Sequence, residues 1–245
     1  MKLKGKVVLV TGANGGIGGA LVKALLDKGV AKVYAAARTA AAAASLVQLD
    51  PDRVVAVQLD VTDAAAVATA AEKCTDVDVL VNNAGVNRGM WLTGPAGVDA
   101  AREEMEVNFF GTLAMCRAFV PVLASREGGV MVTICSIIGL VSMPLNGTYC
   151  TSKAAVHSML QGLRGELAPR NIRVVGVYPG PVETRMTVGL KMPKSTPEQI
   201  AEAIMTGLEK EKEDIFPDPV SRGVRAQLQW SVKKAEKEFA ALVPA

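Results

Sequence analysis

The sequence predicts a doubly wound α/β fold, in which a parallel sheet of about seven strands is covered by helices on both faces. Short β-branched runs alternate with longer helical segments along the chain. Half of the residues are hydrophobic but only 4% are aromatic, so small and β-branched side chains supply most of the apolar content. That composition is typical of a parallel sheet buried on both sides. Strands separated by helical segments imply right-handed βαβ units.

Each element follows from its own run of residues. The expected strands are apolar runs bounded by turn residues, at 6–10, 32–37, 53–59, 77–81, 130–135 and 172–178, with a short edge strand at 213–216. Helices are expected at 16–28, 98–124, 149–167 and 196–212, with an alanine-rich helix after the second strand and a charged terminal helix at 220–242. Thr196 is placed to cap the helix that follows it.

No internal repeat or linker divides the chain, so we expect a single domain over residues 1–245. Within it, 184–194 is expected to be a mobile substrate lid, because apolar residues alternate at Met186, Val188, Leu190 and Met192 and Gly189 favours mobility. The C-terminal helical segment is expected to span 196–242.

Composition argues against several other classes of protein. The net charge is only +3, and no cluster of lysine and arginine contains interleaved aromatic residues, so we expect no nucleic-acid partner. The cysteines and the histidine form no C-x-x-C pair and no metal-ligand cluster, so we expect that no metal is bound. We also expect the cysteines to remain as reduced thiols, as in a cytoplasmic protein. The residues concerned are Cys74, Cys116, Cys135, Cys150 and the only histidine, His157.

One uncharged stretch, 128–152, is long enough to require a test against a membrane helix, which needs about 20 mostly apolar residues. Gly139, Pro144, Asn146 and Gly147 interrupt it, so we expect a buried strand leading into a site, with no membrane association. The apolar run at 7–10 is too brief for the core of a secretory signal.

A glycine-rich turn, Thr11-Gly12-Ala13-Asn14-Gly15-Gly16-Ile17-Gly18, lies between the first strand and the first helix. Glycines let a backbone turn sharply and approach a pyrophosphate, whose charge a helix N-terminus stabilises. The alternative is a tight turn that only closes a βα unit. The strand–turn–helix context favours dinucleotide binding, with contacts expected from Gly12, Asn14, Gly16, Ile17 and Gly18.

The end of the second strand predicts which dinucleotide is bound. An acidic residue there would bind the 2′-hydroxyl of NAD, but the strand ends in alanines followed by Arg38. A planar cation suits the 2′-phosphate of NADP, although a solvated arginine is the alternative. Asp60 is placed to reach the adenine amino group, with Val61 lining its pocket. Asp60 could instead cap the next helix, but Thr62 or Asp63 fits that role better.

Four sequence elements in order resemble the short-chain dehydrogenase/reductase family over about residues 5–190. They are the turn Thr11–Gly18, then Asn82-Asn83-Ala84-Gly85, then Tyr149-Cys150-Thr151-Ser152-Lys153, then Pro179-Gly180. The resemblance implies a Rossmann-like fold. Cys135, where a second serine often precedes the catalytic one, and Cys150, after the tyrosine, depart from the commonest pattern.

The resemblance implies a catalytic set of Asn108, Ser136, Tyr149 and Lys153. Tyrosine and lysine four residues apart share one face of a helix. We expect the ammonium group to lower the phenol pKa from its usual value of about 10, so that Tyr149 can exchange a proton with a carbonyl oxygen. Ser136 would donate a hydrogen bond to that oxygen. Roles for Lys153 at the nicotinamide ribose and for Asn108 in holding a water are implied by the resemblance alone.

The resemblance also implies which residues flank the cofactor. Beside Tyr149 and Lys153, the expected contacts are Asn82, Ala84, Gly85, Pro179, Gly180, Val182 and Thr184. The residues expected to line the substrate pocket are mostly apolar: Asn87, Met90, Trp91, Ile137, Ile138, Met143, Leu145, Pro181, Val182 and Met186. Arg88 is the exception and could meet an anionic group.

These observations predict an NADP-dependent oxidoreductase that reversibly reduces a hydrophobic ketone or aldehyde, a small-molecule carbonyl substrate. One alternative is a 3-oxoacyl-carrier-protein reductase, for which Arg164, Arg170 and Arg173 are candidate docking residues. A second is a protein that senses NADP or acts as a scaffold without turnover. The family resemblance also suggests a homo-oligomer, a tetramer in preference to a dimer, in which helices 98–124 and 149–167 pair with their copies.

Overall fold

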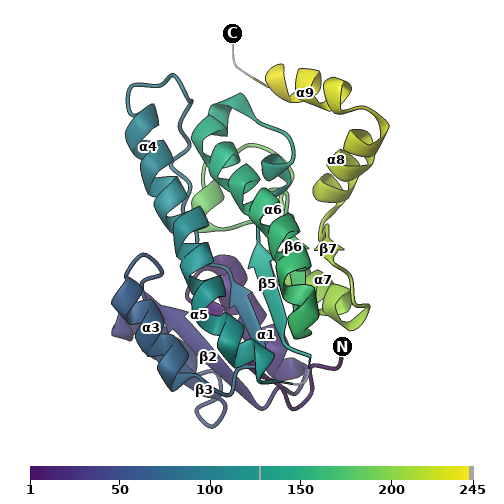
Figure 1. The fold of residues 1–245 in the computed structure, drawn as a ribbon. Coiled ribbons are helices and arrows are strands. Elements are labelled where there is room, and N and C mark those ends of the chain that lie inside the picture. Colours follow the sequence, from purple (N-terminus) through teal and green to yellow (C-terminus); the bar gives the residue numbers. More distant parts are fainter. Residues whose placement is uncertain (127, 243–245) are drawn as a thin grey trace.

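A computed structural model describes residues 1–126 and 128–242, and it confirms the predicted fold (Figure 1). In this part of the chain a seven-stranded sheet has the order β3-β2-β1-β4-β5-β6-β7, and every neighbouring pair is parallel. The strands are β1 Val7–Thr11, β2 Lys32–Ala37, β3 Val54–Gln58, β4 Val79–Asn82, β5 Val130–Ile134, β6 Arg173–Val177 and β7 Asp214–Ile215. The predicted edge strand is therefore present.

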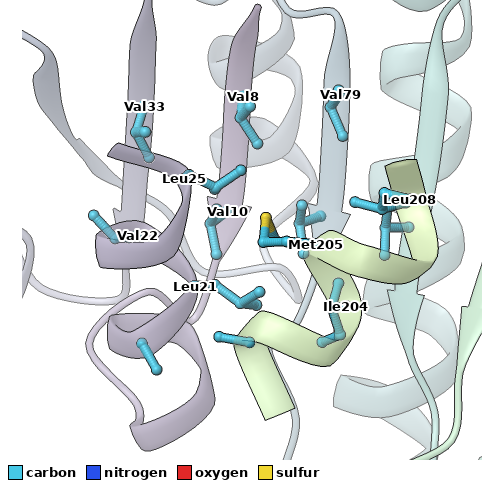
Figure 2. Close-up of a cluster of buried hydrophobic side chains, with 14 of the residues drawn as sticks. Val8, Val10, Leu21, Val22, Leu25, Val33, Val79, Ile204, Met205 and Leu208 are labelled. Carbon is cyan, nitrogen blue, oxygen red and sulfur yellow. The ribbon is translucent and has the colours of Figure 1, made fainter. Parts of the chain in front are cut away.

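Helices cover both faces of the sheet, because successive strand residues point to opposite sides. One face packs against α1 Gly16–Asp27, α2 Ala40–Val47 and α7 Pro197–Glu209. Figure 2 shows this core, in which Leu21 and Leu25 of α1 and Met205 of α7 face the strand β1 that carries Val8 and Val10. The other face packs against α3 Ala64–Lys73, α5 Thr112–Ala124 and α6 Gly147–Leu167.

The predicted helix over 98–124 is continuous but not uniform. It comprises α4 Gly97–Glu104, a π-helical segment Met105–Gly111, and α5. π-helical turns insert an extra residue into a helix and occur often at functional sites. Asn108 lies in this segment, so the irregular turn coincides with a predicted catalytic residue.

The same stretch, Gly97–Ala124, is long and apolar enough by composition to cross a membrane, with a mean hydropathy of 1.5 over its most apolar window. Of that window, 44% is buried inside the protein, and Met115, Phe119 and Leu123 belong to the core beneath the sheet. A core helix passes the same test of length and composition, so this stretch is weak evidence for a membrane span.

The predicted terminal helix over 220–242 is instead two helices, α8 Pro219–Trp230 and α9 Val232–Ala240. The break occurs because the Ser231 hydroxyl accepts a hydrogen bond from the Lys234 backbone N–H and so begins a new helix. Both helices lie beyond the carboxyl ends of the strands, at the end of the molecule opposite the N-terminus (Figure 1). The predicted cap at Thr196 is confirmed by its hydrogen bond from Gln199 N at 3.2 Å.

Four short 3₁₀ turns complete the described elements: Ile137–Gly139, Pro144–Asn146, Ala168–Arg170 and Arg185–Thr187. The first two lie between β5 and α6, in the uncharged stretch that the sequence predicts to lead into a site.

Candidate active site

A large cleft of about 990 Å³ lies at the carboxyl ends of the strands. Strand order reverses between β1 and β4, which are adjacent although β2 and β3 lie between them in sequence. Such a reversal leaves a crevice where ligands of doubly wound proteins bind. Residues of the glycine-rich turn, of the loop after β4 and of α6 all line this one cleft.

The glycine-rich turn packs closely against the loop after β4. Gly12 has φ +60°, and a side chain there would put its Cβ 2.9 Å from Ala84 Cα. The Thr11 hydroxyl accepts hydrogen bonds from Asn83 N and Ala84 N, at 2.9 and 3.0 Å. Glycine is therefore required at position 12 by both its conformation and its surroundings.

The N-terminus of α1 faces the cleft. Gly15 caps the helix without any side-chain hydrogen bond, and Asn14, Gly16 and Ile17 also line the cleft. Backbone N–H groups at the start of a helix have no partner within the helix, and the helix dipole favours negative charge there. This end of the cleft therefore fits the pyrophosphate of a dinucleotide.

At the end of β2, Ala37 is buried while Arg38 is exposed at the rim of the cleft. Asp60 accepts hydrogen bonds from the Thr62 backbone N–H at 3.0 Å and hydroxyl at 2.7 Å. Those bonds, and more weakly the Arg38 guanidinium, lower the pKa of Asp60. Asp63, not Asp60, caps α3. In the described part of the chain Arg38 makes no ion pair within 4.0 Å, so its guanidinium is available to a phosphate group.

The other end of the cleft holds three side chains that are almost completely buried: Tyr149, Lys153 and Ser136. The Lys153 ammonium donates to Ile134 O at 3.0 Å and lies 5.7 Å from the centre of the Tyr149 ring. Burial lowers the pKa of Lys153.

The expected depression of the Tyr149 pKa is wrong for the protein without a cofactor. Burial of the phenol raises its pKa well above the usual value, and the Ser136 hydroxyl offsets this only in part. Lys153 is not among the main groups that offset burial; its ammonium donates to Ile134 O and lies 5.7 Å from the centre of the phenol ring. At neutral pH the phenol therefore holds its proton, which is the state required of a proton donor.

Asn108 is fully buried and does not line the cleft, although it supports residues that do. Its amide donates to Val86 O and to the Ser152 hydroxyl, both at 2.9 Å, and accepts from Val86 N at 2.8 Å. Its backbone oxygen accepts from the Thr112 hydroxyl at 2.7 Å. Asn108 thus joins the loop after β4 to the helix that carries Tyr149.

Most of the residues predicted to bind the cofactor do line the cleft: Gly12, Asn14, Gly16, Ile17, Gly18, Arg38, Asp60, Val61, Ala84, Gly85, Tyr149, Lys153, Pro179, Gly180, Val182 and Thr184. Asn82 does not. It is buried in the sheet, with its amide nitrogen 3.4 Å from the Cys116 sulfur, and Asn83 lines the cleft instead. Side chains alternate along a strand, so the neighbour of a buried residue faces the opposite way.

The substrate end of the cleft is lined by seven of the predicted residues, Asn87, Ile137, Ile138, Met143, Pro181, Val182 and Met186. Met90, Trp91 and Leu145 are not among the lining residues. Leu190 and Met192 of the segment 184–194 also line the cleft. Val220, Phe239 and Leu242, from the region of α8 and α9, were not predicted. Phe239 lies on an amphipathic helix, so the sequence indicates that its side chain packs against the protein. The sequence does not indicate which part of the protein it contacts.

Two further side chains, Arg88 and His157, have hydrogen-bond partners within the protein. The Arg88 guanidinium binds both carboxylate oxygens of Glu103 and does not line the cleft, so it does not provide the expected contact for an anionic substrate. His157 Nδ1 lies 2.8 Å from the Tyr178 hydroxyl, which agrees with a packing role.

The fold and the cleft place the chain among doubly wound α/β proteins with a ligand site at the strand-order reversal. A family model described as short chain dehydrogenase matches residues 6–194. The crystal structure of a short-chain dehydrogenase from Burkholderia cenocepacia in complex with NADP has a TM-score of 0.93 and 37% identity, and the match covers 100% of both chains.

Two relatives match over most of their length. An oxidoreductase of Staphylococcus saprophyticus is 34% identical over 221 residues, which cover 86% of this chain and 94% of that protein. The NADP-dependent 3-hydroxy acid dehydrogenase of Schizosaccharomyces pombe is 31% identical over 238 residues, which cover 89% of this chain and 92% of that protein. The chain belongs to the short-chain dehydrogenase family of oxidoreductases.

Proposed function

We propose that this protein uses NADPH to reduce a hydrophobic ketone or aldehyde to an alcohol, reversibly, with Tyr149 as the general acid and base. The observation that supports this most strongly is the joining of Tyr149, Lys153 and Ser136 to the glycine-rich turn and Arg38 in a single cleft. The NADP complex of the Burkholderia protein and the NADP dependence of the yeast relative support the same cofactor.

The residues present fit NADP along the whole cleft. The start of α1 would hold the pyrophosphate, Arg38 the 2′-phosphate, and Lys153 the ribose next to the nicotinamide. NADPH, when bound, supplies the hydride for the carbonyl carbon.

The protein's own groups would handle the carbonyl oxygen. Tyr149 holds its proton at neutral pH and would donate it to that oxygen, while the Ser136 hydroxyl would stabilise the developing negative charge. Asn108 would keep the loop after β4 against α6 and, as the family resemblance implies, hold a water for proton relay. Tyr149 and Ser136 are both buried, and burial strengthens electrostatic contacts.

The apolar lining supports a hydrophobic substrate. Ile137, Ile138 and Met143 line the cleft, and so do Met186, Leu190 and Met192 of the segment 184–194. The last three are 37–46% exposed, so they present apolar surface that a hydrophobic substrate could cover. We propose that this segment is a substrate lid. Its base is fixed, because Glu183 N donates to Ser195 O at 2.9 Å.

Two of the three candidate docking residues do not favour the carrier-protein alternative. Arg173 begins β6, at the amino ends of the strands, whereas the cleft lies at the carboxyl ends. Arg164 pairs with Asp214, and Arg173 with Glu211. These two arginines are therefore engaged within the chain, and Arg173 lies away from the cleft.

We also propose a single-domain, cytoplasmic homotetramer. Val98 and Phe110 of the 97–124 stretch are 66% and 51% exposed, an apolar surface consistent with pairing between copies.

The proposal is tested by measuring NADPH oxidation with purified protein and a panel of ketones and aldehydes of graded size, together with a 3-oxo acid and a 3-oxoacyl thioester. Turnover is expected to be fastest with apolar ketones or aldehydes. A preference for the acid or the thioester would replace the proposed substrate class, and binding of NADPH without turnover of any carbonyl would favour the sensing alternative.

Arg38→Ala is expected to weaken NADPH binding by roughly 1–3 kcal/mol, the range of a charge-assisted contact with a phosphate. NADH lacks that phosphate, so its affinity should be almost unchanged. Titration of both cofactors measures the difference, and Arg170→Ala, an exposed arginine outside the cleft, is the control. Equal loss of NADH and NADPH affinity, or better turnover of the wild type with NADH, contradicts the role of Arg38.

Phe239→Ala is expected to raise KM for bulky ketones by roughly tenfold and to change KM little for small ones, because it removes apolar contact remote from the reacting carbonyl. Phe239 is half-buried and lines the cleft, whereas Trp230, at the end of α8, is 87% exposed and does not. Trp230→Ala is therefore the matched control. A uniform change in KM across substrate sizes would show that α9 is not a wall of the substrate site.

A further inference from the structure

A buried carboxylate, Glu104, lies near the proton donor without a role in the chemistry described above. It is the last residue of α4, one turn before Asn108, and its exposed fraction is 0%. Oε1 accepts a hydrogen bond from Arg88 N at 2.6 Å, whereas Oε2 has no hydrogen-bond partner among the described residues. A buried carboxylate with one donor is costly, and an apolar side chain would fill this position at a lower cost.

Glu104 is one of three side chains that hold the loop 86–90, which leads from β4 past the active site. Asn108 binds both backbone groups of Val86, and the Thr148 hydroxyl donates to Met90 O at 3.2 Å. Glu104 binds Arg88 between these two points. Alternate residues of the loop are thus fixed from the side of α4 and α6, in the way that a neighbouring strand would fix them.

The positions of these three side chains connect the loop to the catalytic residues. Thr148 directly precedes Tyr149 in α6, and Asn108 also binds Ser152, which directly precedes Lys153. Asn87, between two of the fixed points, lines the cleft. A shift of the loop would therefore move one wall of the substrate site relative to the phenol.

We propose, on the basis of the reductase function above, that Glu104 is a positioning residue: its carboxylate fixes the loop 86–90 beside Tyr149 and places a negative charge near the proton donor. Glu104 acts through its hydrogen bond to Arg88 N and through the electrostatic effect of its charge on the Tyr149 phenol. It makes no contact with the reacting atoms.

The electrostatic part of this role is to raise the pKa of Tyr149. Glu104 contributes to raising the pKa of Tyr149, after burial and the two neighbouring cysteines, and it also raises that of Cys150. The charged or titratable groups around it are Arg88 from the loop, Tyr149 and Cys150 from α6, and Glu103 from its own helix. The Arg88 guanidinium binds Glu103, so among the described residues the backbone N–H of Arg88 is the only hydrogen-bond donor to Glu104.

Two variants separate the two parts of the role. Glu104→Gln keeps an oxygen that can accept from Arg88 N but removes the charge. Glu104→Met keeps the volume and removes both. Asp99→Asn, which removes an exposed carboxylate of the same helix that does not line the cleft, is the matched control.

In Glu104→Gln, the pKa of Tyr149 should fall, because a nearby negative charge no longer disfavours phenolate. The alkaline limb of the pH profile of kcat for ketone reduction, which requires the protonated phenol, should then move to lower pH. The Asp99→Asn profile should remain at the wild-type position. A merely structural role would lower the thermal midpoint and leave the position of this limb unchanged.

In Glu104→Met, hydrogen exchange of the Arg88 amide should be roughly tenfold faster or more, because its acceptor is lost. Glu104→Gln should retain near-wild-type protection. Unshifted pH profiles in Glu104→Gln, or unchanged protection of the Arg88 amide in Glu104→Met, overturn the proposal. If Glu104→Met does not fold, the Glu104→Gln profile decides. If the wild type reduces no carbonyl, the reductase function fails, whereas amide exchange still shows whether Glu104 fixes the loop.

Discussion

Tyr149→Phe is expected to lower kcat for carbonyl reduction by a factor of at least about 10², because the substitution removes the only hydroxyl assigned to proton donation. The ring remains, so the packing of this nearly buried side chain against Lys153 should persist. NADPH affinity and the thermal midpoint should therefore change little. Stopped-flow and steady-state turnover, with NADPH titration alongside, measure the two effects separately.

The matched control for this substitution is Tyr34→Phe. The Tyr34 hydroxyl binds Lys32 and Asp76, and Tyr34 does not line the cleft. Its loss should leave kcat near the wild-type value. Near-wild-type activity in Tyr149→Phe would show that another group donates the proton, and equal losses in both variants would indicate a general effect on folding.

Gly18→Ala is expected to lower NADPH affinity by at least about tenfold and to destabilise the protein, because the new methyl group must displace the cofactor turn. A Cβ at this position would overlap Gly12 O and lie 2.8 Å from both Ala13 Cα and Asn83 Nδ2. The atoms it meets are mainly backbone, which cannot move without opening the turn. Calorimetric titration with NADPH and thermal unfolding measure the two effects.

Gly19→Ala is the matched control, one residue further along α1. Its Cβ would have Ala13 O as nearest neighbour at 3.6 Å, an ordinary van der Waals contact. Alanine is favoured over glycine inside a helix by about 1 kcal/mol, so this variant should bind NADPH normally and be slightly more stable. If Gly18→Ala and Gly19→Ala behave alike, close packing of the turn is not what the cofactor site requires.

The fold could be predicted from local patterns because each strand of a parallel sheet is a compact apolar run. Val7–Thr11 and Val130–Ile134 are buried throughout and have turn residues on either side. The limits of the helices were harder to predict. The break at Ser231 depends on whether its hydroxyl caps a new helix, and the π-helical turn at Asn108 leaves no distinct pattern in the residue sequence.

The candidate site could be predicted where a motif ties residue type to backbone geometry, as in the glycine-rich turn and the Tyr149–Lys153 spacing. Features of the site that depend on tertiary packing could not be predicted from the sequence. Phe239 meets the cleft only because α9 folds back over the carboxyl ends of the strands. The direction of the Tyr149 pKa shift required knowledge of how deeply the phenol is buried, because burial dominates the shift.

The most direct test of the central claim is a single-turnover reaction with NADPH carrying deuterium at the transferable position of its nicotinamide ring. With a hydrophobic ketone, mass spectrometry should find one deuterium on the carbinol carbon of the product for each NADP formed, and Tyr149→Phe should slow its appearance by at least about 10². If NADPH binds stoichiometrically but no label reaches any carbonyl substrate, the protein is not a reductase of this kind.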